Sequence, residues 1–253
     1  MNLGIFSTVL AIVGLATEAA LAAVLAYCRR HRQFPFFYTY AFYALFLDAS
    51  AHPIKAFTSQ TVYFNFYWAS QVVYTILGVL AMNESFRKVL QPYFLGKWWF
   101  RCLVPGVAII ILALAAWKGL RHAPVQINRL TLFYFYLPFY LASDYMRAAI
   151  FGLFATLVVF WRARWQPCAF GIMKGFGLFT IVGMLADLLR SDFGTKMDWF
   201  FSYAPAVAYI VACLIWLGAF LKGEPENSSG KTGSLTNLDE VIEVLTRLKK
   251  ALE

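Results

Sequence analysis

The sequence predicts an all-α integral membrane protein: a bundle of seven transmembrane helices followed by a short amphipathic helix. Of its 253 residues, 61% are hydrophobic and 14% are charged, whereas soluble domains carry about 45–50% apolar and about 25% charged residues. The apolar residues form long runs close to the roughly 20 residues that cross a bilayer. The chain has a net charge of +9, and most of its Lys and Arg residues lie between these runs, so the excess of positive charge is expected at the membrane edges. The expected partner is therefore the lipid bilayer, and no basic face for nucleic acid is expected.

The runs are too long for strands and apolar on all sides, which favours helices over a barrel. The fifth run ends near Trp161 and starts between Thr131 and Leu141, where Pro138 is expected to kink or break the aromatic stretch 131–141. The other six predicted helices are Leu3–Tyr27, Pro35–Ala56, Val62–Met82, Trp99–Trp117, Cys168–Leu189 and Asp198–Leu221.

Positive charges predict how the bundle is threaded, because Lys and Arg favour the cytoplasmic side. Ten of them lie at the odd-numbered connections and the root of the tail, against six at the even-numbered connections. The N-terminus is then outside and the C-terminus cytoplasmic. The ten are Arg29, Arg30, Arg32, Arg87, Lys88, Lys97, Arg101, Arg162, Arg164 and Lys222; the six are Lys55, Lys118, Arg121, Arg129, Arg190 and Lys196.

The tail differs in composition from the seven-helix domain of residues 1–222. Residues 223–236 are polar and rich in Gly and Ser, which is typical of a flexible linker. Within residues 237–253, apolar residues recur at three- and four-residue spacing, which predicts an amphipathic cytoplasmic helix. This helix is expected either to contact a protein partner or a second copy of the chain, or to lie on the membrane or the inner loops.

Charged side chains inside the membrane cost free energy and usually face the bundle interior or water. Five polar side chains fall at similar depth in the outer half of helices two, five and six: Asp48, His52, Asp144, Arg147 and Asp187. One hypothesis is an outer polar pocket, lined also by tyrosines, that binds a small molecule. The alternative is local pairing within each helix, as in Asp144 with Arg147 or Asp48 with His52.

Two further acidic residues are candidates for other roles. Glu18 lies near the middle of helix one, deeper than the outer cluster, and is the candidate for proton or ion coupling. Glu84 and Arg87 follow helix three at the inner membrane edge and form a candidate switch. A local pair between Glu84 and Arg87 or Lys88 is the simpler interpretation.

The residues needed for several kinds of chemistry are missing. Of three histidines, only His52 lies in a predicted span, so neither haem nor zinc ligation is expected. The sequence contains no HExxH, GxSxG or P-loop motif. Seven helices with an outer N-terminus resemble rhodopsin-type receptors in layout alone, since residues 198–221 hold no lysine for a retinal Schiff base. We therefore expect no enzymatic activity, cofactor or metal.

These observations favour a receptor or sensor that binds a small molecule in the outer pocket. A proton- or ion-coupled solute carrier and an assembly subunit of a membrane complex are the alternatives. The short loops and the absence of an Asn-x-Ser/Thr acceptor on the predicted outer side favour a cell membrane, specifically a bacterial inner membrane.

Overall fold

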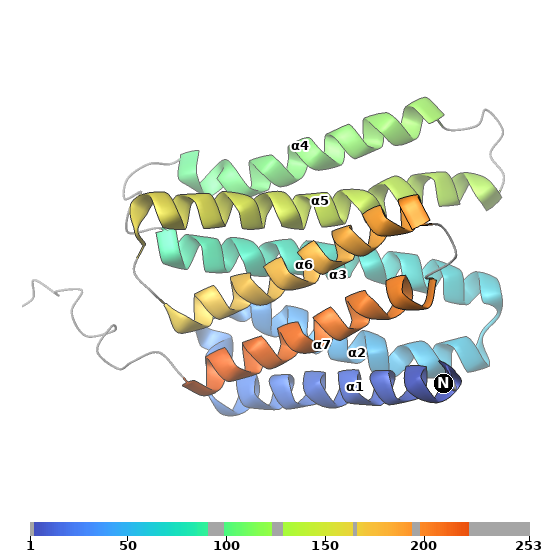
Figure 1. Ribbon diagram of the computed structural model, residues 1–253, viewed down its shortest axis with the longest axis horizontal. Helices are drawn as coiled ribbons and strands as arrows, with labels where there is room; N and C mark the ends of the chain where they lie inside the picture. Colours follow the sequence, from blue (N-terminus) through green and yellow to red (C-terminus); the bar gives the residue numbers. More distant parts are fainter. Residues whose placement is uncertain (1–2, 91–98, 123–128, 164–165, 194–197, 223–253) are drawn as a thin grey trace, which may run out of the picture. The chain divides into compact units, whose positions relative to one another are not determined.

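The computed structural model describes residues 3–90, 99–122, 129–163, 166–193 and 198–222, and the described residues form helices without a strand (Figure 1). The tail beyond Lys222, including the predicted linker and amphipathic helix, lies outside the described residues. The elements are α1 Leu3–Tyr27, the short 3-10 helix η1 Arg30–Arg32, α2 Pro35–Phe57, α3 Gln60–Leu90, α4 Trp99–His122, α5 Arg129–Trp161, α6 Pro167–Phe193 and α7 Asp198–Lys222.

Four of these helices are long and apolar enough to cross a membrane. The qualifying segments are Phe6–Tyr27, Ala142–Trp161, Pro167–Ala186 and Tyr203–Lys222, in α1, α5, α6 and α7. They support a multi-pass membrane protein. Helix α4 has a shorter apolar stretch, Cys102–Leu114. Tyrosines and polar residues interrupt the apolar sequence of α2 and α3, so crossing by all seven helices and the direction of threading stay predictions.

Predicted boundaries of four helices need correction. Helix α4 continues beyond Trp117 to His122, and α6 continues beyond Leu189 to Phe193. Helix α5 runs unbroken from Arg129 to Trp161, so the break expected near Pro138 is wrong. Proline is tolerated in membrane helices because neighbouring groups take up the freed backbone bonds. Helix α3 continues two turns beyond Met82 to Leu90, because residues 83–90 keep making helical backbone bonds outside the apolar run.

The first 222 residues form one compact unit in which α3 occupies a central position. Helix α3 contacts α2, α4, α5 and α6, while α1 lies between α2 and α7 and α4 packs mainly on α5. The closest packing joins α6 and α7. A Cβ added at Gly171 would overlap Ala219, and one added at Gly175 would overlap the indole of Trp216. These two glycines therefore let the helices approach closely.

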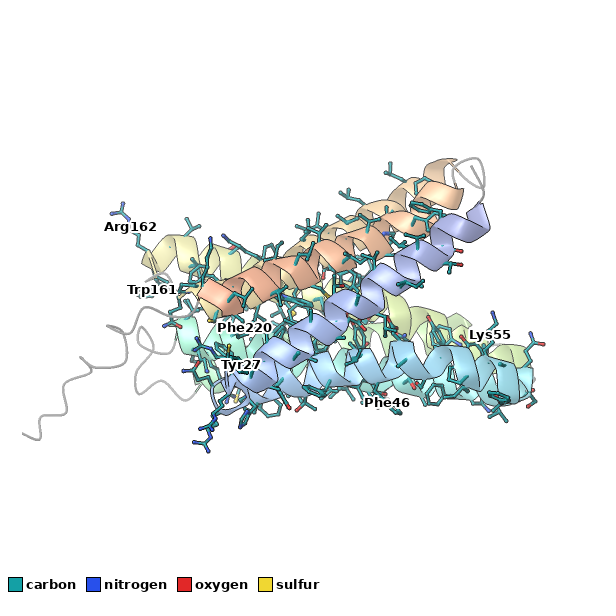
Figure 2. The ribbon with its side chains drawn as sticks, turned by 90° about the horizontal axis from the view of Figure 1, so that it is seen from below. Tyr27, Phe46, Lys55, Trp161, Arg162 and Phe220 are labelled. Carbon is teal, nitrogen blue, oxygen red and sulfur yellow. The ribbon has the colours of Figure 1, made fainter. Side chains whose placement is uncertain are left out.

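The two ends of the bundle are distinguished by labelled side chains in Figure 2. Tyr27, Trp161 and Phe220 lie at one end, here called the Tyr27 end, and Lys55 lies at the other. A buried aromatic cluster fills the half toward the Tyr27 end, where Trp216 is 1% exposed and its Nε1 donates to the Ile172 carbonyl at 3.1 Å. The cluster consists of Phe37, Tyr40, Phe176, Trp216 and Phe220.

Candidate functional site

A polar cavity of about 370 Å³ lies inside the bundle, on the Lys55 side of the aromatic cluster. Small-molecule sites in proteins commonly enclose about 300–1,000 Å³, so the volume suits a small ligand. Every described α-helix except α4 contributes to its wall. The lining residues are Glu18 of α1; Ala44, Leu47 and Asp48 of α2; Tyr67, Gln71 and Tyr74 of α3; Asp144 and Arg147 of α5; Phe179 and Gly183 of α6; and Pro205, Ala206 and Tyr209 of α7.

Glu18 is the most unusual residue of the cavity wall. Its side chain comes from the middle of α1 and the residue is only 2% exposed. Its Oε2 atom is buried and has no hydrogen-bond partner among the described residues. The Asp48 carboxyl of α2 is close enough to repel it, and Tyr209 of α7 is the nearby hydroxyl donor. A buried acceptor without a partner costs about 1–3 kcal/mol, so such groups are rare unless something else binds them.

Arg147 is the cation of the cavity wall, and its own helix already engages it. Its Nη2 forms an ion pair with Asp144 Oδ1 at 2.8 Å and also donates to Ser143 Oγ at 3.1 Å. Its Nε donates to the Ser143 carbonyl at 3.3 Å. The guanidinium lies 5.3 Å from the ring centroid of Phe179, within cation–π range. Arg147 and Asp144 are therefore a held pair that adds little net charge to the cavity.

Aromatic side chains form much of the rest of the wall and its floor. Tyr67 and Tyr74 come from α3, Phe179 from α6 and Tyr209 from α7. The Tyr74 hydroxyl forms a hydrogen bond with the Tyr40 hydroxyl. Tyr40 lies one helical turn before the lining residue Ala44 in α2, toward the Tyr27 end. Tyr74, Phe179 and Tyr209 are the lining residues of their helices nearest the Tyr27 end, and all four rings offer flat faces to an organic ligand.

The structure brings together three of the five predicted ligand residues, Asp48, Asp144 and Arg147, at one cavity. The predicted local pair of Asp144 and Arg147 is also present, so pairing and pocket coexist. Glu18 lines the same cavity, although the sequence predicted that it lies deeper in the membrane than the five outer residues. The side chains of the other two candidates, His52 and Asp187, lie outside the described residues.

Sequence reasoning did not place α1 or α7 at the cavity, and it missed Tyr209 of α7 and Phe179 of α6. Adjacency of helices decides which residues meet, and hydropathy carries no information about adjacency. The sequence did contain one indication of the segment around Tyr209, because Pro205 lies one turn earlier in α7. Proline inside a membrane helix often marks a functional or bent segment.

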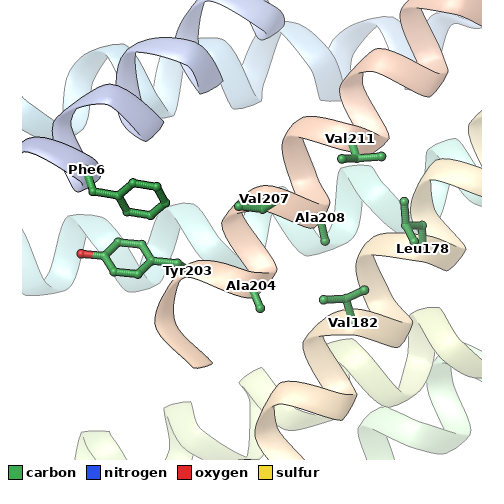
Figure 3. A pocket seen from close by; sticks show the side chains of 8 residues that line it. All are labelled: Phe6, Leu178, Val182, Tyr203, Ala204, Val207, Ala208 and Val211. Carbon is green, nitrogen blue, oxygen red and sulfur yellow. The ribbon is translucent and has the colours of Figure 1, made fainter. Parts of the chain in front are cut away.

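An apolar pocket of about 410 Å³ is lined by residues of α1, α6 and α7 (Figure 3). At about 100° per residue, its α7 residues lie on the face opposite the cavity residues Pro205, Ala206 and Tyr209. The ring of Phe6 meets that of Tyr203 edge to face, with centroids 5.0 Å apart. One stretch of α7 thus separates a polar from an apolar space. The apolar pocket is lined by Phe6, Leu178, Val182, Tyr203, Ala204, Val207, Ala208 and Val211.

Glu84 makes a contact that neither prediction included. Its Oε2 accepts hydrogen bonds from the backbone amides of Phe36 and Phe37, at 3.1 and 3.2 Å, in the first turn of α2. The expectation of a simple local pair was therefore incomplete, because a helix N-terminus also attracts a carboxylate. Burial raises the pKa of Glu84, against the lowering effects of these amides and of Lys88. Lys88 donates to the Gln33 carbonyl, which further ties α3 to the segment before α2.

Nowhere in the described part of the chain do three His, Cys, Asp or Glu side chains gather closely enough to hold a metal ion. No family model matches the chain. No curated protein or solved structure matches it either. The cavity and its side chains are thus the basis for inferring function.

Proposed function

We propose that the chain is a non-enzymatic membrane receptor that binds a small molecule in the polar cavity. The observation that carries this proposal is the buried carboxyl of Glu18, a lining residue of the cavity, whose Oε2 has no partner among the described residues. The free-energy cost of burying an acceptor without a partner is retained in a protein when that acceptor serves ligand binding. Asp48, the Asp144–Arg147 pair and the tyrosines supply the remaining polar and aromatic contacts.

Helices α6 and α7 pack more tightly near the Tyr27 end than beside the cavity, and this difference in packing supports a signalling role. Toward the Tyr27 end, Gly171 and Gly175 hold the helices in tight contact. At the cavity, a Cβ at Gly183 would meet no atom within 4 Å, and Pro205 lacks the amide that α7 would otherwise use. A ligand touching this looser segment would shift it relative to the tightly packed half, and so pass movement along α7 toward the tail.

A thermal-shift screen of the purified full chain tests the receptor proposal. A ligand should raise the Tm of the wild type, and the shift should shrink in Asp48→Asn and Arg147→Gln. Asp48→Asn keeps the size of the side chain, whereas Arg147→Gln shortens it and removes the partner of Asp144, so the unliganded Tm of each variant serves as the control for folding. If every compound shifts the variants as much as the wild type, the cavity is not the binding site.

A second function, a proton- or ion-coupled carrier, is favoured by one observation: Glu18 lines the same cavity as the other polar residues. A carrier would load a coupling ion and a solute at one buried site. Reconstitution in liposomes separates the two functions. A carrier predicts uptake that Glu18→Gln abolishes, whereas uptake that survives Glu18→Gln contradicts the coupled carrier.

A further inference from the structure

The eight described residues that line the apolar pocket all fall within segments that are long and apolar enough to cross a membrane. These segments are Phe6–Tyr27 of α1, Pro167–Ala186 of α6 and Tyr203–Lys222 of α7. The described walls consist of aliphatic side chains and aromatic rings. The pocket is therefore at membrane depth, and its described walls match hydrocarbon in chemistry.

Small residues on α7 leave the space open. Figure 3 shows Ala204 and Ala208 of α7 facing Leu178 and Val182 of α6 across the pocket. The two methyl groups of α7 are too short to fill the volume of about 410 Å³ between these walls. An empty volume of this kind forfeits dispersion contacts, and water in an apolar space lacks the polar partners that it needs. An apolar occupant is thus favoured over both.

The pocket opens on a surface that suits contact with lipid. Val207 and Val211, which line its α7 wall, are 43% and 39% exposed. On α6, Leu185 follows the lining residue Val182 by about one turn and is 51% exposed. The pocket wall is therefore continuous with an exposed apolar surface on two candidate membrane spans, so a lipid chain can enter it from the side.

We propose that this pocket binds one acyl chain of a bilayer phospholipid. The inference goes beyond the proposed function, because the pocket and the polar cavity share no described lining residue. A flexible chain fills an irregular space between helices and makes the van der Waals contacts that the helices do not make with each other.

The lengths of the pocket and of the chain agree. Phe6 and Tyr203 are the first residues of their apolar segments, and their rings meet edge to face with centroids 5.0 Å apart. A headgroup beside them would lie at the membrane edge, where tyrosine is common. Val211 lies about 12 Å further along α7, within the roughly 15 Å of hydrocarbon in one leaflet. One chain anchored at the edge thus reaches along the whole α7 wall.

The test is photolabelling of the full chain in nanodiscs of phosphatidylcholine. A small share of the lipid carries a diazirine in the middle of one acyl chain, and mass spectrometry of peptides locates the label. Wild-type protein should be labelled preferentially within Leu178–Val182 and Ala204–Val211. Ala208→Phe, which places a ring in the pocket, should lose this labelling. Ala20→Phe, at an exposed position of α1, is the matched control and should keep it.

Two results with phosphatidylcholine would overturn the proposal. Equal labelling of all exposed apolar faces would show that the lipid has no preferred site. Labelling that Ala208→Phe retains at the wild-type Tm would show that the chain lies outside the pocket. If Ala208→Phe does not fold, Val182→Trp fills the space from α6 and the same comparison applies.

Two other occupants give different results, and either one contradicts a phospholipid chain. If diazirine-labelled oleate reacts at these residues and labelled phosphatidylcholine does not, the occupant is a free fatty acid. If the wild type is a dimer that Ala208→Phe dissociates in size-exclusion chromatography, and the lipid label is absent from the pocket, a second copy of the chain covers it.

Discussion

Replacing Glu18 with glutamine should stabilise the protein while it impairs ligand binding. The carboxyl is 2% exposed and its Oε2 lacks a partner among the described residues. Glutamine keeps the shape, removes the repulsion with Asp48 and adds a donor for the Asp48 carboxylate. Relief of one unsatisfied buried group corresponds to about 1–3 kcal/mol. For a chain of this size, that increase in the free energy of unfolding raises Tm by about 2–12 °C.

The same chemical change at Asp144 should have the opposite sign, which makes it the matched control. Asp144 pairs with Arg147 at 2.8 Å, and the two side chains are 12% and 7% exposed. Asp144→Asn weakens a charged hydrogen bond worth about 1.5–3 kcal/mol and should lower Tm. Scanning fluorimetry of both purified variants without ligand measures the two shifts. A lower Tm for Glu18→Gln would refute the reasoning, because Glu18 would then stabilise the fold.

Three further predictions concern the rest of the chain. Glu84→Ala removes the acceptor of the Phe36 and Phe37 amides at the start of α2 and should lower the free energy of unfolding by about 1 kcal/mol. Because burial raises the pKa of Glu84 in the folded state, the wild type should lose stability as pH rises above 4.5, and the variant should not show this loss. Gly175→Ala should lower the free energy of unfolding by about 1–3 kcal/mol, and with it the Tm, because the added Cβ overlaps Trp216. Gly218→Ala should not lower the Tm, because open space surrounds its Cβ. Deleting residues 237–253 should abolish co-purification of any protein partner bound by the predicted amphipathic helix; a partner that is retained excludes this segment as its contact.

The helices were largely predictable because each apolar run is a local property of the sequence. The predicted first helix, Leu3–Tyr27, has the bounds of α1, and Asp198–Leu221 differs from α7 by one residue. The errors occur where a helix extends beyond its apolar run, as in the two polar turns that end α3. Helical backbone bonds there do not depend on lipid, so hydropathy could not show them.

The candidate site was predictable only in part. The i, i+3 spacing of Asp144 and Arg147 indicated their pair, since that spacing places them on one helix face. Glu18 was separated from them because its depth was counted along the chain. Helix α1 runs obliquely to α2 (Figure 2), and tilted helices do not share a common depth scale. The position of Tyr209 beside Glu18 depends on contact between α1 and α7, which no local pattern encodes.

Native mass spectrometry of the full chain, released from membranes in mild detergent, tests the central claim most directly. The comparison uses Gly183→Leu, which fills the cavity from a position with open space, and Gly218→Leu as the control outside the cavity. The account predicts one small molecule bound to the wild type and to Gly218→Leu, and none bound to Gly183→Leu. A wild type that carries no small molecule, or a molecule that Gly183→Leu retains, would contradict it.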